Sequence, residues 1–240
     1  MHSVNSPFAS PARARPYDQR FEVGQIGPSL RSARLLLGHL WRYLQPRSVA
    51  EVGCGRGAWL KAFRELGAET LFGYDGPWNS PEMLIDGTIE FHAVDMNAPF
   101  ALPSGLDLAM SLEVAAHLDP SLAGQFVGRL TGASNAVLFS AASLGPDGEQ
   151  LEQLRHSRWA ELFAREGFQP FDLFRSRFWG DRDLSYWHRQ NTFLYARSGS
   201  AQCLRLRQAG AEPLADAAMV DRGSPELYGR HGALPGKLPH

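Results

Sequence analysis

A short apolar run followed by three glycines in five residues constrains this chain more than any other feature. Residues 48–52 (SVAEV) have the length and composition of a buried strand, and they lead directly into residues 53–57 (GCGRG). Glycine adopts backbone conformations that other residues avoid, and it lets a ligand approach without meeting a side chain. The helix predicted over residues 58–66 would point its first amides at such a ligand. We therefore expect a strand, a tight loop and a helix that together hold a polar ligand.

Strand and helix signals alternate along the rest of the chain. Further strands are predicted at residues 70–74, 91–94, 106–112, 135–141, 168–174 and 192–196, and further helices at 120–130 and 150–166. This alternation predicts an α/β fold, a mostly parallel sheet with helices on both faces. The last two strands are joined by a long aromatic segment, and we expect them to form an antiparallel hairpin at a sheet edge. Ligands of such sheets bind at the carboxyl ends of the strands.

The chain of 240 residues suits one large domain with a tail. We predict a disordered leader at residues 1–28, because its first part contains several Ser and Pro and no acid. Ser29 is then the N-cap of the first helix. The domain itself is predicted at 29–198. Residues 199–240 are expected to hold a helix, over about residues 200–218, and a loosely ordered tail.

Charge and composition argue against several classes of partner. The chain has 24 Lys and Arg against 25 Asp and Glu, so no net field draws it to nucleic acid or to a membrane surface. No apolar run reaches the roughly 18 residues that a membrane span requires. Cys54 and Cys203 lie far apart in the sequence, which argues against a disulfide framework or a zinc site and favours a cytoplasmic location. The sequence carries no indication of the oligomeric state.

Acidic residues lie at the ends of the first three predicted strands. Glu51 can face an amino group near the glycine loop. Asp75 lies after Gly57 at about the spacing of a ribose-binding acid. Asp95 can accept a hydrogen bond from the adenine amine, while Met96 offers a backbone amide and an apolar wall. In this order the acids predict a nucleotide-type cofactor.

An NAD-dependent oxidoreductase is the first alternative, because Gly53, Gly55 and Ala58 also satisfy the dinucleotide fingerprint. The fingerprint is compressed, however, and Asp95 would have no clear role in a dinucleotide site. No Tyr-x-x-x-Lys or similar hydride-transfer constellation is visible. The alternative is therefore disfavoured.

The run of strand ends resembles the class I S-adenosylmethionine-dependent methyltransferases. Residues 51–57 are similar to their motif I, Asp75 to the acid of motif II and Asp95 to that of motif III. A narrower bacterial group of small-molecule methyltransferases has close counterparts of residues 72–78, 111–118, 139–142, 187–191 and 225–228, so the similarity covers roughly residues 30–230. The resemblance implies a Rossmann-like, seven-stranded sheet. It also implies S-adenosylmethionine as methyl donor and S-adenosylhomocysteine as product.

The residues expected to bind the donor all lie at or just after a predicted strand end: Glu51, Gly53, Gly55, Gly57, Asp75, Gly76, Asp95, Met96 and Leu112. The glycines would shape the loop, Glu51 would orient the methionine end, Asp75 the ribose and Asp95 the adenine.

Two further residues are candidates for the acceptor chemistry. Methyl transfer from a sulfonium is an in-line displacement that needs a positioned nucleophile and a proton acceptor. Glu113 and His117 follow the fourth predicted strand at positions i and i+4, so they share a face if the segment is helical. His117 is our first candidate for a general base or substrate orienter, and Glu113 would order it or bind the acceptor. The alternatives are a structural histidine and a capping acid.

Two departures from the bacterial group bear on metal binding. Ala116 stands where the relatives have a second acid, and Gln150 aligns with their histidine after the fifth strand. Glu113 and His117 alone are too few ligands, so we predict no metal, although a shift of the loop would let His156 restore a ligand. The same departures leave a non-catalytic nucleotide-binding module as a second alternative.

Residues 174–191 mix aromatic and basic side chains. We expect them to pack the hairpin with their arginines in solvent; a lid over the acceptor and a single-stranded nucleic-acid surface are the alternatives. Trp78 and Trp159 either line the acceptor pocket or belong to the core. By analogy with the relatives, the predicted reaction is O-methylation of a small molecule.

Overall fold

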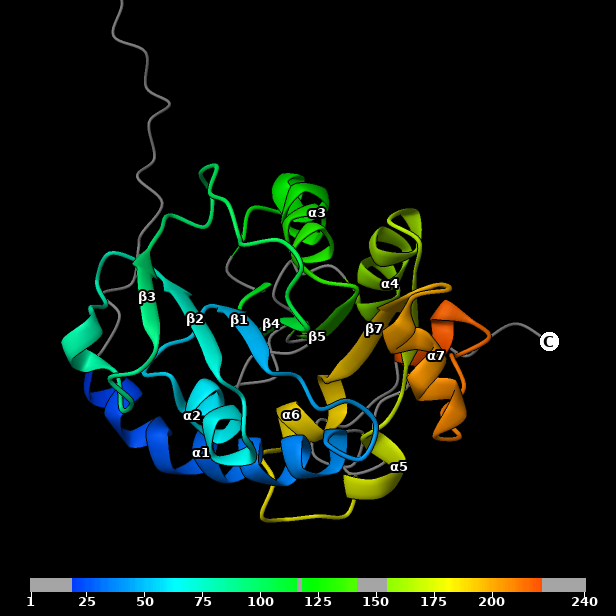
Figure 1. The fold of residues 1–240 in the computed structure, drawn as a ribbon, viewed down its shortest axis with the longest axis horizontal. Helices are drawn as coiled ribbons and strands as arrows, with labels where there is room; N and C mark the ends of the chain where they lie inside the picture. The colour runs from blue at the N-terminus through cyan, green and yellow to red at the C-terminus, as the bar shows by residue number, and fades with distance from the viewer. Residues whose placement is uncertain (1–18, 116–117, 142–154, 222–240) are drawn as a thin grey trace, which may run out of the picture.

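The computed structural model describes residues 19–115, 118–141 and 155–221. Within these residues one seven-stranded sheet has the order β3-β2-β1-β4-β5-β7-β6. Its strands are β1 Ser48–Val52, β2 Thr70–Asp75, β3 Glu90–Ala93, β4 Leu108–Leu112, β5 Ala136–Ser140, β6 Phe168–Phe171 and β7 Phe193–Arg197. The first five strands are parallel, and β7 runs antiparallel to both β5 and β6. The predicted fold class is confirmed (Figure 1). β6 is the edge strand of the antiparallel pair.

Helices cover both faces of this sheet. The α-helices are α1 Gln19–Leu40, α2 Ala58–Leu66, α3 Ala123–Ala133, α4 His156–Arg165, α5 Arg175–Phe178, α6 Tyr186–Asn191 and α7 Ala201–Gln208. Short 3-10 turns lie at η1 Pro81–Met83, η3 Pro120–Leu122 and η4 Ala217–Asp221. Figure 1 shows α1 and α2 on one face of the sheet and α3 and α4 on the other.

The side chains of alternate residues in the central strands pack into two separate hydrophobic cores. Leu108 and Met110 of β4 pack with α1 and α2, whereas Ala109 between them packs with α3 and α4. Leu138 and Phe139 of β5 divide in the same way. Because both faces of a parallel sheet are buried, these strands have continuous apolar runs, which is why the sequence indicated them clearly.

The strand order reverses at β1. Glu51 of β1 lies opposite Gly73 of β2 on one side and Met110 of β4 on the other. The chain connections leave this point in opposite directions, and in open α/β sheets ligands bind at the carboxyl ends of the strands at such a point. The glycine loop follows β1 and Glu113 follows β4, so both predicted sites lie at this edge of the sheet.

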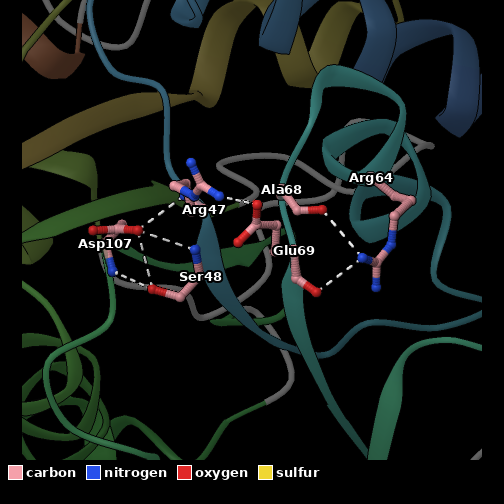
Figure 2. Close-up of polar contacts among 6 residues, drawn as sticks. All are labelled: Arg47, Ser48, Arg64, Ala68, Glu69 and Asp107. Atoms are coloured by element: carbon pink, nitrogen blue, oxygen red, sulfur yellow. Dashed lines mark hydrogen bonds and ion pairs between the residues drawn. The ribbon is translucent and has the colours of Figure 1, made fainter.

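A polar network holds the opposite, amino-terminal edge together (Figure 2). The Asp107 carboxylate accepts hydrogen bonds from the backbone amides of Arg47 at 2.9 Å and Ser48 at 3.0 Å, and from the Ser48 hydroxyl at 3.1 Å. The guanidinium of Arg47 pairs with Glu69, and Arg64 donates to the Glu69 carbonyl at 2.8 Å. These bonds join the starts of β1, β2 and β4 and thereby support their register.

Several element boundaries differ from prediction, most of all at the first helix, at the end of β6 and at the C-terminal helix. The first helix begins at Gln19 rather than Ser29, so the end of the predicted leader segment is helical and Pro28 lies inside the helix. A proline weakens a helix interior, but the buried stripe that ends at Leu40 anchors this helix against the core. β6 ends at Phe171, because the Asp172 carboxylate accepts a hydrogen bond from the Arg175 amide and turns the chain into α5.

The C-terminal helix α7 ends at Gln208 instead of continuing to about residue 218. Gly210 adopts a φ of 84°, which reverses the chain, and Pro213 follows shortly after. In the part of the chain that the structure describes, no helix has the length and hydropathy of a membrane span. Cys54 and Cys203 are both buried, and neither forms a disulfide.

Candidate active site

The three glycines of the loop after β1 all have positive φ, at 81° for Gly53, 51° for Gly55 and 78° for Gly57. A Cβ atom on Gly53 would lie 2.0 Å from Cγ2 of Val114, and one on Gly57 would lie 2.7 Å from Cδ1 of Ile89. A Cβ on Gly55 would meet nothing within 4 Å. Packing therefore requires the outer two glycines, whereas Gly55 borders open space.

Asp75, the last residue of β2, ties this loop to the sheet. Its carboxylate accepts hydrogen bonds from the backbone amide of Gly55 at 2.5 Å and from that of Gly76 at 2.6 Å. Burial raises the pKa of Asp75, and these two amides with the side chains of Asn79 and Trp78 oppose the rise. Asn79 also donates to the Gly55 carbonyl at 2.5 Å. The predicted ribose acid thus lies against the glycine loop.

The Glu51 carboxylate is buried at the end of β1, with 2% of the residue exposed. Its Oε2 makes no hydrogen bond to any residue that the structure describes. Burial, and then the negative charge of nearby Asp75, raise the pKa of Glu51 well above its usual range. A buried acceptor beside a second carboxylate is stabilised by a ligand that brings a positive charge or a hydrogen-bond donor.

Asp95 and Met96 lie just beyond β3. The Asp95 side chain is exposed, and its Oδ1 accepts a hydrogen bond from the Asn97 amide at 2.9 Å, which shapes the turn. Met96 is half-buried against the core, and its carbonyl accepts from Arg129 at 3.3 Å. Val94 donates to the Asp75 carbonyl at 2.7 Å, so this turn is held next to the end of β2. The adenine roles of Asp95 and Met96 stay predictions.

Leu112 ends β4 in the core, and Glu113 follows it with a φ of 60°. This left-handed conformation is uncommon for a residue other than glycine. The Glu113 amide donates to the Ser140 hydroxyl at 2.9 Å and to the Ser140 carbonyl at 3.2 Å. Burial raises the pKa of the Glu113 carboxyl to about 7, against the opposing effect of hydrogen bonds from Ser140 and Asn191. A carboxyl group with this pKa suits proton transfer near neutral pH.

Asn191 and His156 also lie at this candidate site, although the sequence did not predict that either residue contacts the surroundings of Glu113. Asn191, the last residue of α6, donates from Nδ2 to Oε1 of Glu113 at 3.4 Å. Its Oδ1 lies 3.3 Å from Nε2 of His156, the first residue of α4. The sequence alone could not show that Ser140 and Asn191 lie beside Glu113, because these residues are far from it in the chain.

His117, Ala116 and Gln150 lie outside the described residues, so the predicted pairing of Glu113 with His117 stays a prediction. Within residues 19–115, 118–141 and 155–221, no three His, Cys, Asp or Glu side chains are grouped in a way that suits a metal ion. The expectation that the protein binds no metal also stays a prediction.

The segment from Phe174 to Asn191 packs differently from prediction. Arg175 is buried, because it pairs with Asp172 at 2.7 Å and lies 4.6 Å over the Phe193 ring. Arg189 is buried as well and donates to the Asp181 carbonyl at 2.6 Å. Arg177 and Arg182 are exposed, as expected. The prediction that these arginines lie in solvent is therefore wrong for Arg175 and Arg189, which have a carboxylate and a carbonyl partner respectively.

The two tryptophans have different surroundings. Trp159 is buried in the core against Phe139, with ring centroids 5.1 Å apart. Trp78 is 52% exposed, and its ring lies across Gly76, where a Cβ would be only 2.2 Å from the indole. Trp78 is therefore available to a ligand beside Asp75, whereas Trp159 is not.

A groove of about 470 Å³ lies on another part of the molecule. It is lined by residues of α4, of the edge strand β6 and of the segment 212–215. β4, β5 and β7 separate β6 from β1 in the sheet, so the groove is not part of the site at the glycine loop.

The strand order and the helices on both faces define the fold of the class I methyltransferases. An O-methyltransferase family protein from Burkholderia thailandensis has a TM-score of 0.54 at 15% identity, over 75% of this chain and 59% of its own. A chain from the complex of the Haloferax volcanii Trm112 methyltransferase activator has a TM-score of 0.52 at 15% identity, over 74% of this chain and 92% of its own.

A dimethyltransferase of amino-demethyl-riboflavin from Streptomyces davawensis has a TM-score of 0.49 at 20% identity, over 62% of this chain. The chain spans 51% of that protein and 59% of the Burkholderia one. No protein-family model and no curated protein matches the sequence. At these identities the likeness is one of fold.

Proposed function

We propose that this chain transfers a methyl group from S-adenosylmethionine to a small-molecule acceptor by O-methylation. One observation carries the proposal: the Oε2 atom of Glu51 is buried beside Asp75 at the glycine loop and has no hydrogen-bond partner among the described residues. Two carboxylates at this place favour a cationic ligand, and the donor carries both an ammonium group and a sulfonium. They disfavour binding of the negatively charged pyrophosphate of a dinucleotide, because that group needs positive charges or amide donors around it.

The other residues of the loop fit the same ligand. The open space at Gly55 lets the donor lie against the backbone. Asp75 already accepts from two backbone amides, and a ribose hydroxyl would replace the N–H of the half-exposed Trp78 as a further donor to it. Asp95 would accept from the adenine amine and Met96 would contact its ring. Leu112 would close the pocket from the end of β4.

For the transfer itself, the acceptor hydroxyl must lie in line with the sulfonium and lose its proton. The acceptor oxygen takes the methyl group, and the sulfonium becomes a thioether. Glu113 takes the proton in this proposal, since burial raises the pKa of its carboxyl to about 7 and the residue lies beside the switch point. His117 is the other candidate base. The two acids of the site thus have separate roles, Glu51 toward the donor and Glu113 toward the acceptor.

The proposal is tested by calorimetric titration of the protein with S-adenosylmethionine, S-adenosylhomocysteine and NAD. We expect both adenosyl ligands to bind and NAD not to bind. If Glu51 holds the ammonium group, Glu51→Gln should weaken the binding of both adenosyl ligands by about tenfold or more. If Glu51 faces the sulfonium, the variant should weaken the binding of S-adenosylmethionine only. Glu69→Gln, which changes an exposed acid at the opposite edge, is the matched control. A preference for NAD, or binding of none of the three ligands, would contradict the proposal.

The acceptor class needs a second experiment. Transfer of a labelled methyl group to a panel of small hydroxylated compounds would identify it, with Glu113→Gln as the variant expected to lose turnover. Product labelled at nitrogen or carbon would overturn the O-methylation part. Tight donor binding without transfer to any compound, and without slow hydrolysis of the donor, would favour the non-catalytic alternative.

A further inference from the structure

A chain of polar groups connects three elements behind Glu113. His156 begins α4, Asn191 ends α6, and Glu113 follows β4. The hydrogen bonds between them measure 3.3 Å from His156 Nε2 to Asn191 Oδ1 and 3.4 Å from Asn191 Nδ2 to Glu113 Oε1. Both His156 and Asn191 are buried, which shields the bond between them from water.

The direction of this chain follows from the chemistry of the groups. An amide oxygen only accepts, so Nε2 of His156 must carry its hydrogen and donate to Asn191. That bond fixes the Asn191 amide with its NH₂ group toward Glu113, where it donates to the carboxylate. Burial lowers the pKa of His156 to about 4, opposed by the charge of Asp221, so the ring is neutral at neutral pH. A neutral ring in this tautomer therefore sets the orientation of the amide.

The backbone of Glu113 is held equally firmly. Its φ of 60° is unfavourable for a residue with a Cβ, and the two hydrogen bonds from its amide to Ser140 maintain it. Ser140 also donates to the Glu113 carboxylate. Backbone and side chain are thus fixed from two sides, by β5 and by α6. Such strain is kept in proteins mainly where a side chain must point in one direction.

We propose that Asn191 and His156 are positioning residues that hold the Glu113 carboxylate in its orientation for proton transfer. This inference rests on the proposed function, in which Glu113 accepts the proton of the acceptor. Within the described part of the protein, the charged groups that act on His156 are Arg175 of α5 and Asp221 of η4. Among the described residues, burial raises the pKa of Glu113, and the hydrogen bonds from Ser140 and Asn191 oppose the rise.

The test is a carbon-13 NMR titration of protein labelled at the glutamate carboxyl carbons, with the Glu113 signal assigned through Glu113→Gln. A hydrogen bond to a carboxylate favours its ionised form. Asn191→Leu should therefore move the midpoint of Glu113 upward, by about one pH unit. His156→Leu should move it in the same direction by less. His156→Gln, which keeps an N–H donor, should return it toward the wild-type value.

His188→Leu is the matched control, because His188 is a buried histidine on the same helix as Asn191. Its pKa is lowered by burial alone, and its ring packs edge-on against Trp59. We expect this variant to leave the midpoint of Glu113 unchanged. Asn191→Ser serves in place of Asn191→Leu if the latter does not fold, since it also removes the amide donor.

An unchanged midpoint in the folded Asn191 variant would overturn the inference. So would a shift in His188→Leu as large as that in His156→Leu, because that result would indicate a general loosening of α6. Binding of S-adenosylhomocysteine, measured on the same samples, keeps the two proposals separate. If the wild type binds no adenosyl ligand, the proposed function fails, while the titration still decides whether Asn191 and His156 hold Glu113.

Discussion

The Asp75 carboxylate accepts a hydrogen bond from the backbone amide of Gly55 at 2.5 Å, so the end of β2 holds the glycine loop that follows β1. The same carboxylate lies 2.6 Å from the Gly76 amide. One side chain therefore shapes the loop and presents an acceptor beside it. Four predictions test how the fold supports this site.

Asp75→Ala should weaken the binding of S-adenosylhomocysteine by about tenfold or more, because the loop loses its tie and the ribose loses its acceptor. Asp75→Asn should have a smaller effect, since its amide oxygen can still accept one backbone hydrogen. Calorimetric titration of both variants measures the effect. An unchanged dissociation constant in Asp75→Ala would show that this carboxylate does not contact the ligand.

The outer and middle glycines of the loop should respond differently to alanine. Gly53→Ala places a Cβ against Val114 and strains the backbone, so the free energy of unfolding should fall by about 1–3 kcal/mol. Gly55→Ala meets open space and should cost about 1 kcal/mol, from backbone strain alone. It should nevertheless lose most of its affinity for S-adenosylhomocysteine, because the methyl group occupies the ligand's space. Urea denaturation and ligand titration of both variants check this pair, and full affinity in Gly55→Ala would contradict it.

Asp107→Ala should destabilise the fold without affecting the site. The carboxylate accepts three hydrogen bonds from Arg47 and Ser48, so its removal should lower the free energy of unfolding by about 1–3 kcal/mol. These bonds (Figure 2) join the starts of β1 and β4, whereas the glycine loop follows the end of β1, so the affinity for S-adenosylhomocysteine should stay the same. Denaturant midpoints and calorimetry on one preparation provide both values. A loss of affinity as large as that of Asp75→Ala would mean that the two edges are coupled.

His188 should make the folded state sensitive to acid. Burial lowers the pKa of His188 to about 3, so below about pH 6.5 the unfolded chain binds this proton and the folded protein does not. The histidine therefore reduces stability as pH falls, by about 1.4 kcal/mol per pH unit in this window.

His188→Phe keeps a ring against Trp59 and should remove that contribution. Melting temperatures of wild type and variant, measured from pH 7 to pH 4, should diverge as the pH falls, with the variant more stable. His156 titrates in the same direction in both proteins and cancels in the difference. Parallel curves would show that His188 takes up its proton in the folded state.

Several features could be predicted from the sequence. These are the apolar runs that form the strands, the glycine loop after β1, and the positions of Glu51 and Asp75 at strand ends. Each depends on a local pattern: a run of buried residues, glycines at a strand end, or an acid just after a strand. Parallel sheets bring such strand ends to one edge, so residues distant in the chain could be placed together without knowing their contacts. The same reasoning failed at Ser29 and near residue 218, where helix ends depend on packing as well as on caps.

Only the tertiary structure decided which side chains complete the second part of the site. Asn191 is 78 positions from Glu113 and 35 from His156, and no sequence pattern relates the three. The burial of Arg175 could not be predicted from the sequence either, because it depends on hydrogen bonds to the carbonyls of residues 219 and 220, which lie far along the chain. The sequence by itself determined the fold and the loop, since these follow from local backbone preferences and periodic burial. The pairing of buried polar groups follows from the three-dimensional packing that brings each donor to its acceptor.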